Sequence, residues 1–196
     1  GHGDDEIISR DQAIEWFDLD HVGKSPSRFD FKKLENLNGH YIREADDLRL
    51  AELVGAQMNG EVDPDLLSRA MPVLKVRAKD LNELAAGAAF LFVQRPLAID
   101  EKAQGLLTPE SRMLLGRITA RLTDETDWTI DQLEASLKAM AEELGLGLGK
   151  LAQPLRAALT GQTTSPGIFD VLVLLGRDES LARIADQVST ASAQQV

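Results

Sequence analysis

Positively charged side chains gather at three places in this sequence of 196 residues, and they are its best candidates for binding chemistry. A guanidinium group can stack on an unpaired nucleobase or donate paired hydrogen bonds to its edge, and an ammonium group can neutralise a phosphate. Such clusters are also common on ordinary solvated surfaces, so they do not by themselves identify a partner. The clustered residues are Lys24, Arg28, Lys32 and Lys33, then Lys75, Arg77 and Lys79, and finally Lys150 and Arg156.

The chain offers little from which an active site can form. The segment Gly145–Lys150 (GLGLGK) has the composition of a phosphate-binding loop, but it lacks the required spacing and the Ser or Thr after the lysine, so we interpret it as a helix end followed by a tight turn. His21 and His40 have no companion carboxylate pattern, and the sequence shows no Ser/His/Asp arrangement or metal-ligand spacing. Because the chain has no cysteine, it can build neither a thiolate metal site nor a disulfide. We therefore expect a binding module with no catalytic residue, no metal site and no cofactor of its own.

Composition limits the partners that such a module can have. The formal net charge of -11 argues against sequence-blind binding to DNA or RNA, which needs a broad basic surface. It allows binding to a structured RNA, because a protein that reads a few unstacked bases needs only local basic clusters. No apolar run is long enough to span a membrane, and the acidic start of the chain is unlike a signal peptide. We expect a soluble, cytoplasmic protein.

The elements that must position these side chains all have helical periodicity. In the first half, helix starts are predicted at a Ser9/Gln12 capping box, at three aspartates and at an Asp-Pro pair. We expect Pro72 to interrupt the fourth of these helices, and Pro96 with the polar stretch after it to mark a joint. The predicted caps are Ser9, Asp30, Asp46, Asp63 before Pro64, and Asp80.

Three further helix starts are predicted in the second half, at Thr108-Pro109, at Thr129 with Gln132, and at Ser165-Pro166. The apolar run 171–175 has the length of a buried strand, but the Ser-Pro before it and Gly176 after it favour a buried helix. The predicted fold class is therefore all-α, with small helical bundles in series. Division near Ala45 and again near Leu107 gives segments 1–45, 46–107 and 108–190, followed by a frayed tail at 191–196.

Three longer segments resemble the C-terminal part of bacterial glutamyl-tRNA synthetases. Ser27–Ile42 (SRFDFKKLENLNGHYI) is similar to the stretch that follows the KMSKS loop in the stem-contact region of that family. Leu148–Gly161 (LGKLAQPLRAALTG) and Ser165–Gly176 (SPGIFDVLVLLG) resemble its anticodon-binding end. A terminal Leu181–Ile184 (LARI) follows in the same order, so the resemblance covers nearly the whole chain.

The resemblance implies a fragment of a class I synthetase. That family binds ATP and glutamate in an N-terminal Rossmann domain with HIGH and KMSKS motifs, and both motifs are absent from this sequence. The fragment is then no enzyme, while its parent is a glutamate–tRNA ligase that uses ATP and Mg. Segment 1–45 becomes a stem-contact region, and 46–107 and 108–190 become two anticodon-binding subdomains. The implied partner is tRNA-Glu, which the chain contacts at the anticodon loop and stem. We expect no binding to DNA or to a membrane, and we expect the protein to be a monomer.

The resemblance also assigns roles to particular residues. Arg156 matches an arginine that stacks on or contacts anticodon bases, and Arg77 matches the arginine that reads the third anticodon base. The helix-entry segment that borders those bases is matched by Ser165, Pro166, Gly167 and Ile168, although some relatives have Thr in place of Ser165.

Four alternatives stay open at this stage. The chain can be a helical enzyme with an unrecognised carboxylate site, which would need a closed pocket with perturbed acids. Arg77 can be a surface residue paired with Asp80 or Glu83. The chain can belong to a paralogue that glutamylates tRNA-Gln as well, or instead. It can also be a helical protein-interaction scaffold, and basic side chains gathered on one concave face would argue against that alternative.

Overall fold

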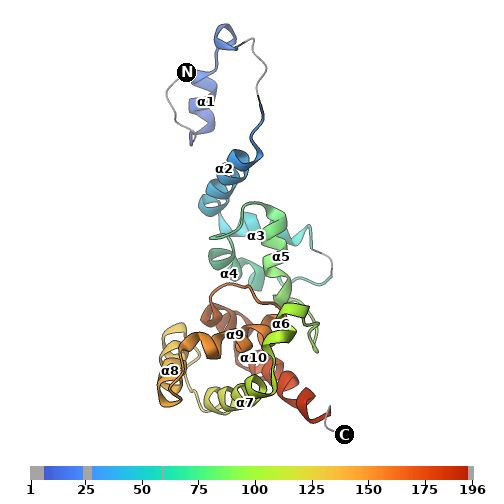
Figure 1. Ribbon diagram of the computed structural model, residues 1–196. Helices are drawn as coiled ribbons and strands as arrows, with labels where there is room; N and C mark the ends of the chain where they lie inside the picture. The colour runs from blue at the N-terminus through green and yellow to red at the C-terminus, as the bar shows by residue number, and fades with distance from the viewer. Residues whose placement is uncertain (1–6, 24–27, 59, 194–196) are drawn as a thin grey trace.

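The computed structural model describes residues 7–23, 28–58 and 60–193, and every regular element within them is helical, which confirms the predicted all-α class. Figure 1 shows the chain running from α1 at one end, through α2, into two successive groups of helices. Predictions for Lys24, for the start of the segment at Ser27 and for 194–196 lie outside the described residues. The helices are α1 (Arg10–Trp16), α2 (Phe31–Glu44), α3 (Asp47–Gly55), α4 (Pro64–Leu74), α5 (Leu81–Ala88), α6 (Glu101–Leu106), α7 (Pro109–Thr123), α8 (Ile130–Glu143), α9 (Leu148–Thr160) and α10 (Ile168–Ala193), with the 3-10 helices η1 (Leu19–His21) and η2 (Ala89–Leu91).

Most of the predicted helix starts are confirmed. Ser9 and Gln12 form a reciprocal capping box, with 3.1 Å from the Gln12 nitrogen to Ser9 Oγ and 2.9 Å from the Ser9 nitrogen to Gln12 Oε1. Each of the other predicted caps of the first half accepts a hydrogen bond from a backbone N–H in the first turn of its helix. Thr108 does the same at the start of α7.

The predictions made for Pro72 and for the cap at Thr129 are wrong. Helix α4 continues through Pro72 to Leu74, although a proline inside a helix supplies no N–H to the carbonyl four residues earlier. The exposed position of Pro72 and the burial of Leu67 and Met71 on the opposite side account for this continuation. At α8, the Thr129 hydroxyl donates to Asp127 Oδ2 at 3.3 Å instead of capping the helix, so the predicted capping box does not form.

The segment from 97 to 193 contains two helices that the periodicity did not predict, α6 and α9. Helix α6 occupies the polar stretch after Pro96, and α9 follows the predicted tight turn, where Gly145 has a φ of 63°. Helix α10 begins at Ile168 rather than at Ser165-Pro166, and it includes the run 171–175, so the prediction of a helix there is confirmed. Gly176 (φ 76°, ψ 171°) kinks α10, and the helix then extends to Ala193, into the segment expected to fray.

The first group of helices, α3 to α5, packs around its own buried leucines and methionine, and α2 is only partly covered by it. Phe31 and Leu34 on α2 are 71% and 47% exposed, and α1 has no buried residue. Tyr41 ties α2 to the segment before α1, because its hydroxyl donates to the carbonyl of Ile8 at 2.7 Å. The apolar faces predicted for these two helices are therefore largely exposed in this chain.

The second group, α6 to α10, packs around α9 and α10, and α10 also contacts α4 of the first group. A close approach at Gly161 attaches the connection before α6 to the end of α9: the nitrogen of Asp100 donates to the carbonyl of Gly161 at 2.9 Å. The segment 162–167 that follows then lies beside α4 and α5 (Figure 1). None of the described helices combines the length and the apolar character that crossing a bilayer requires.

Candidate nucleic-acid interface

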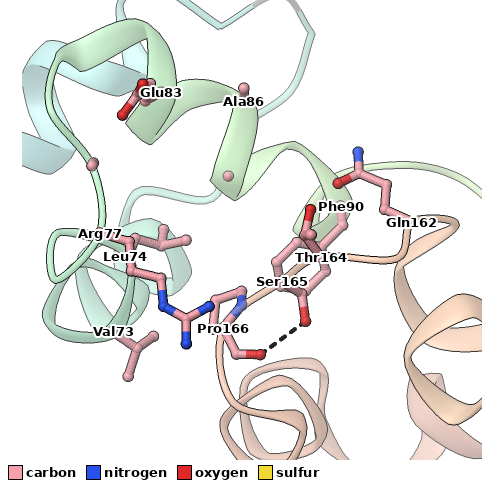
Figure 2. Close-up of a pocket in the computed structure, with 12 residues that line it drawn as sticks. Val73, Leu74, Arg77, Glu83, Ala86, Phe90, Gln162, Thr164, Ser165 and Pro166 are labelled. Atoms are coloured by element: carbon pink, nitrogen blue, oxygen red, sulfur yellow. Dashed lines mark hydrogen bonds between the residues drawn. The ribbon is translucent and has the colours of Figure 1, made fainter. Parts of the chain in front are cut away.

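A pocket of about 320 Å³ lies between the two groups of helices. This volume is at the lower end of the roughly 300–1,000 Å³ that small-molecule sites occupy. Buried Leu74 and Phe90 supply apolar lining, and polar groups of Arg77, Glu83 and segment 162–165 supply the rest. One wall consists of Val73, Leu74, Arg77, Ala78, Glu83, Ala86, Gly87 and Phe90, and the other consists of Gln162, Thr164, Ser165 and Pro166 (Figure 2).

Arg77 lies in the turn between α4 and α5, where its side chain is exposed. Figure 2 shows its guanidinium group extending toward the wall that carries Pro166. Among the residues the structure describes, it makes no ion pair with Asp80 or Glu83. The Asp80 carboxylate accepts from the nitrogen of Glu83 at 2.7 Å, and Glu83 Oε2 accepts from the nitrogen of Lys79 at 2.8 Å. The guanidinium donors of Arg77 therefore face the pocket without a carboxylate partner.

Arg156 lies on α9 behind the opposite wall and is half-buried. Its Nη1 donates to the carbonyl of Pro166 at 2.7 Å, to the carbonyl of Ser165 at 3.2 Å and to the Ser165 hydroxyl. Burial, and then the positive charge of Arg77, lower the pKa of Arg156, which stays protonated at neutral pH. The two arginines therefore act on each other as like charges. A partner rich in hydrogen-bond acceptors would relieve this repulsion.

The four predicted residues of segment 165–168 are placed differently from one another. Ser165 and Pro166 line the pocket, and the Ser165 hydroxyl also donates to the carbonyl of Pro166 at 2.9 Å. Gly167 is exposed, and a Cβ there would lie 2.3 Å from Asp170 Oδ2, so a larger residue would displace that carboxylate. Ile168 is 5% exposed and belongs to the core, so a partner would meet only its backbone. Helix α10 therefore begins two residues after Pro166, the last residue of this segment that lines the pocket.

The other basic residues near the pocket contact carboxylates on neighbouring helices. Lys75 Nζ lies 2.7 Å from Asp47 Oδ1 and donates to the carbonyl of Ala45 at 3.0 Å. Lys79 Nζ lies 3.6 Å from Glu35 Oε2. These contacts attach α3 to the end of α4, and α2 to the turn before α5. Lys150 lies apart, beside a separate pocket at the start of α9.

Three residues of the pocket carried no signal in the sequence. Phe90 lies in an apolar helical pattern, which predicts only a core position. Gln162 and Thr164 lie in a polar connection whose neighbours become known only once the segment after α9 is placed beside α4 and α5. Only the packing of the two groups brings Gln162 and Thr164 together with Arg77.

Comparisons with known proteins identify relatives over nearly the whole length of the chain. A family model described as "Anticodon binding domain" matches residues 49–188. The chain is 64% identical, over 96% of its length, to "Glutamate--tRNA ligase 2" of Novosphingobium aromaticivorans, of which it covers 40%. It is 65% identical, over 97% of its length, to "Glutamate--tRNA ligase 1" of Erythrobacter litoralis, of which it also covers 40%.

A solved structure of a glutamate tRNA ligase from Elizabethkingia meningosepticum superposes with a TM-score of 0.82 at 29% identity, covering 95% of this chain and 38% of that one. The chain thus spans about 40% of the length of the curated relatives that it matches. These relatives confirm the resemblance to bacterial glutamyl-tRNA synthetases. Because the family model matches most of an all-helical chain, the protein belongs to the anticodon-binding domain family.

Proposed function

We propose that this chain is the anticodon-reading portion of a glutamate–tRNA ligase, the enzyme that attaches glutamate to tRNA-Glu with ATP and Mg. The names of relatives more than 60% identical support this proposal. The catalytic steps belong to the rest of the full-length enzyme. The described residues contain no group of His, Asp or Glu side chains suited to hold a metal ion, so no step through ATP or Mg is assigned to them. The proposed setting is the cytoplasm, and the proposed state is a monomer.

The placement of two arginines around one pocket is the observation that carries this proposal. Arg77 of the first group lines one wall of the pocket, and Arg156 of the second group lies behind the other wall, where it donates to the carbonyls of Ser165 and Pro166. A protein-interaction scaffold gives no reason for arginines on both sides of one pocket. An unpaired base inserted between the walls does give a reason, because it can offer ring and carbonyl acceptors to guanidinium donors and a flat face for stacking.

The geometry further supports a role for Arg77 in base selection. An unpaired cytosine offers N3 and O2 as adjacent acceptors, which match the two donors of a guanidinium fork. Guanine presents N1–H and N2–H donors along much of the same edge and would face Arg77 donor to donor. We infer that Arg77 selects the cytosine that ends the tRNA-Glu anticodon over the guanine that ends that of tRNA-Gln. A paralogue that also charges tRNA-Gln would lack this preference.

The rest of the RNA contact is proposed from position. Segment 1–45 is the proposed stem contact, and Ser165, Pro166 and the exposed backbone at Gly167 border the bases. The start of a helix leaves N–H groups free to bond base edges. The net charge of -11 is consistent with a contact limited to such sites and argues against DNA as a partner.

A competition experiment tests this function. Labelled tRNA-Glu is bound to the pure chain and displaced with an isolated anticodon stem–loop or with an isolated acceptor stem of the same tRNA. We expect the anticodon stem–loop to compete and the acceptor stem to fail. Equal competition by the two RNAs, or no binding of tRNA-Glu, contradicts the proposal.

A further inference from the structure

Arg183 on α10 is an unusual residue for a protein core. Its side chain is 1% exposed and is the largest of the fully buried side chains. A buried guanidinium is tolerated only when its donors are paired, because removing the charge from water is unfavourable. The partners of Arg183 therefore show what this position does.

Three of those partners are backbone carbonyls from distant parts of the chain. Nη1 donates to the carbonyls of Phe90 and Leu159, at 2.8 Å each, and Nη2 donates to the carbonyl of Val93 at 3.3 Å. Leu159 lies in the last turn of α9, where carbonyls have no donor within the helix, and Phe90 and Val93 lie in and after the short helix η2. Arg183 thus supplies donors that neither segment has on its own.

An acidic partner orients the guanidinium. Glu179, one turn earlier on α10, accepts from Arg183 Nε at 2.6 Å. The other oxygen of Glu179 lies 3.4 Å from Nε of Arg95, and Nη1 of Arg95 lies 3.5 Å from Asp186 Oδ2. We call Arg183, Glu179 and the three carbonyls the carbonyl clamp. Arg95 extends it to the connection between the two groups of helices.

The carbonyl clamp joins the two walls of the pocket from behind. Phe90 itself lines the first wall. Leu159 lies three residues after Arg156 on α9, and Arg156 holds Ser165 and Pro166 of the second wall. Hydrogen bonds to an inserted base would need distances near 2.7–3.2 Å, so a change in wall spacing of about 1 Å breaks them.

We propose that Arg183 is a positioning residue for base recognition: it fixes the spacing of the two walls, and so of Arg77 relative to Arg156, without contacting RNA. The inference rests on the proposed function. Lysine keeps the charge at this position but has a single ammonium group, which cannot reproduce a planar fork aimed at Glu179 and three carbonyls. A residue that only stabilised the core would change the melting temperature and leave the spacing and the base preference intact.

A distance measurement tests the spacing without RNA. Because the chain has no cysteine, cysteines introduced at exposed Arg69 on α4 and Ala135 on α8 can be spin-labelled selectively. Double electron–electron resonance is expected to give one narrow distance distribution in the otherwise unchanged chain, and a shifted or broadened one with Arg183→Lys. The matched control is Leu122→Ala, a cavity in α7 that lowers stability and leaves the clamp in place. An unchanged distribution in folded Arg183→Lys overturns the proposal.

A binding ratio tests the consequence for recognition. The affinities for tRNA-Glu and for its variant with guanine at the last anticodon position are measured for five chains: the parent, Arg183→Lys, Leu122→Ala, Arg77→Gln, and Arg77→Gln combined with Arg183→Lys. We expect Arg183→Lys to reduce the preference for cytosine toward unity, Leu122→Ala to keep it, and the double variant to match Arg77→Gln alone. A preference retained in Arg183→Lys overturns the inference. A parent chain without any preference overturns the base-selection proposal instead, and the distance measurement still decides whether Arg183 spaces the walls.

Discussion

The three arginines around the pocket differ chiefly in how much water reaches them. Arg77 is exposed, Arg156 is half-buried and Arg183 is buried. An exposed guanidinium keeps its donors free for a partner, and a buried one must use its donors within the protein. Arg156 is intermediate: Nη1 holds the second wall, and the group remains charged beside Arg77.

Replacement of Arg156 by alanine separates its two roles. We expect Arg156→Ala to weaken the binding of tRNA-Glu by roughly 1 to 3 kcal/mol, the range found for stacking contacts to single-stranded bases. The loss of stability should be smaller, about 0.5 to 1.5 kcal/mol, because the carbonyls of Ser165 and Pro166 can turn to water. Titration with tRNA and thermal melting of the same samples check this. Arg117→Ala, at an exposed position on α7, is the matched control and should change neither quantity. Unchanged affinity would show that Arg156 is a structural residue only.

Among the ends of the helices, the end of α9 at Gly161 has the most demanding geometry. Its φ is +73°, and a Cβ there would lie 2.4 Å from the carbonyl oxygen of Ala98. The same residue ends α9 and accepts a hydrogen bond from Asp100 at the start of α6. The second wall of the pocket begins at the next residue.

We therefore expect Gly161→Ala to destabilise the chain by about 2 to 4 kcal/mol, from the left-handed backbone and the forced displacement of Ala98. Gly105→Ala is the matched control, since that glycine lies within α6 with open space around it. It should be neutral or stabilising by up to about 1 kcal/mol. Urea unfolding of the two variants measures the difference. Equal stabilities of the two variants would contradict a requirement for glycine at position 161.

The helices show how far the sequence could predict the structure. Helix caps at Ser9, Asp30 and Asp80 were predictable because a cap and its N–H donor lie within three residues of each other. The continuation of α4 past Pro72 was not predictable, because burial of the opposite helix face outweighs one missing hydrogen bond. Helix α6 was missed because six residues are too few to show a periodicity.

In the candidate site, the residues named in advance came from the resemblance and not from periodicity. Basic clustering suggested Arg77 and Arg156, but it suggested Lys75 and Lys79 equally, and these lysines bind carboxylates of α3 and α2. The role inferred for Arg183 depends on carbonyls more than twenty residues away along the chain. No local pattern encodes such a contact.

The whole molecule is acidic, whereas its proposed partner, tRNA, is a polyanion. With a net charge of -11, most of the surface repels RNA, so affinity has to come from the few places where positive groups and base-edge contacts coincide. The pocket between the two groups of helices is such a place, and it exists only when both groups are folded together. Base selectivity is therefore expected to be a property of the assembled chain.

The most direct test of base reading by Arg77 compares two RNAs on three proteins. The affinities for tRNA-Glu and for its variant with guanine in place of the last anticodon cytosine are measured with the parent chain and with Arg77→Gln. Arg69→Gln, at an exposed arginine on α4, is the control. A good bidentate contact gives about 1 to 3 kcal/mol of discrimination, so the parent chain should prefer the cytosine by roughly ten- to a hundredfold. We predict that Arg77→Gln loses this preference at an unchanged melting temperature, while Arg69→Gln keeps it. An undiminished preference in Arg77→Gln would contradict the assignment of Arg77 as the base-reading residue.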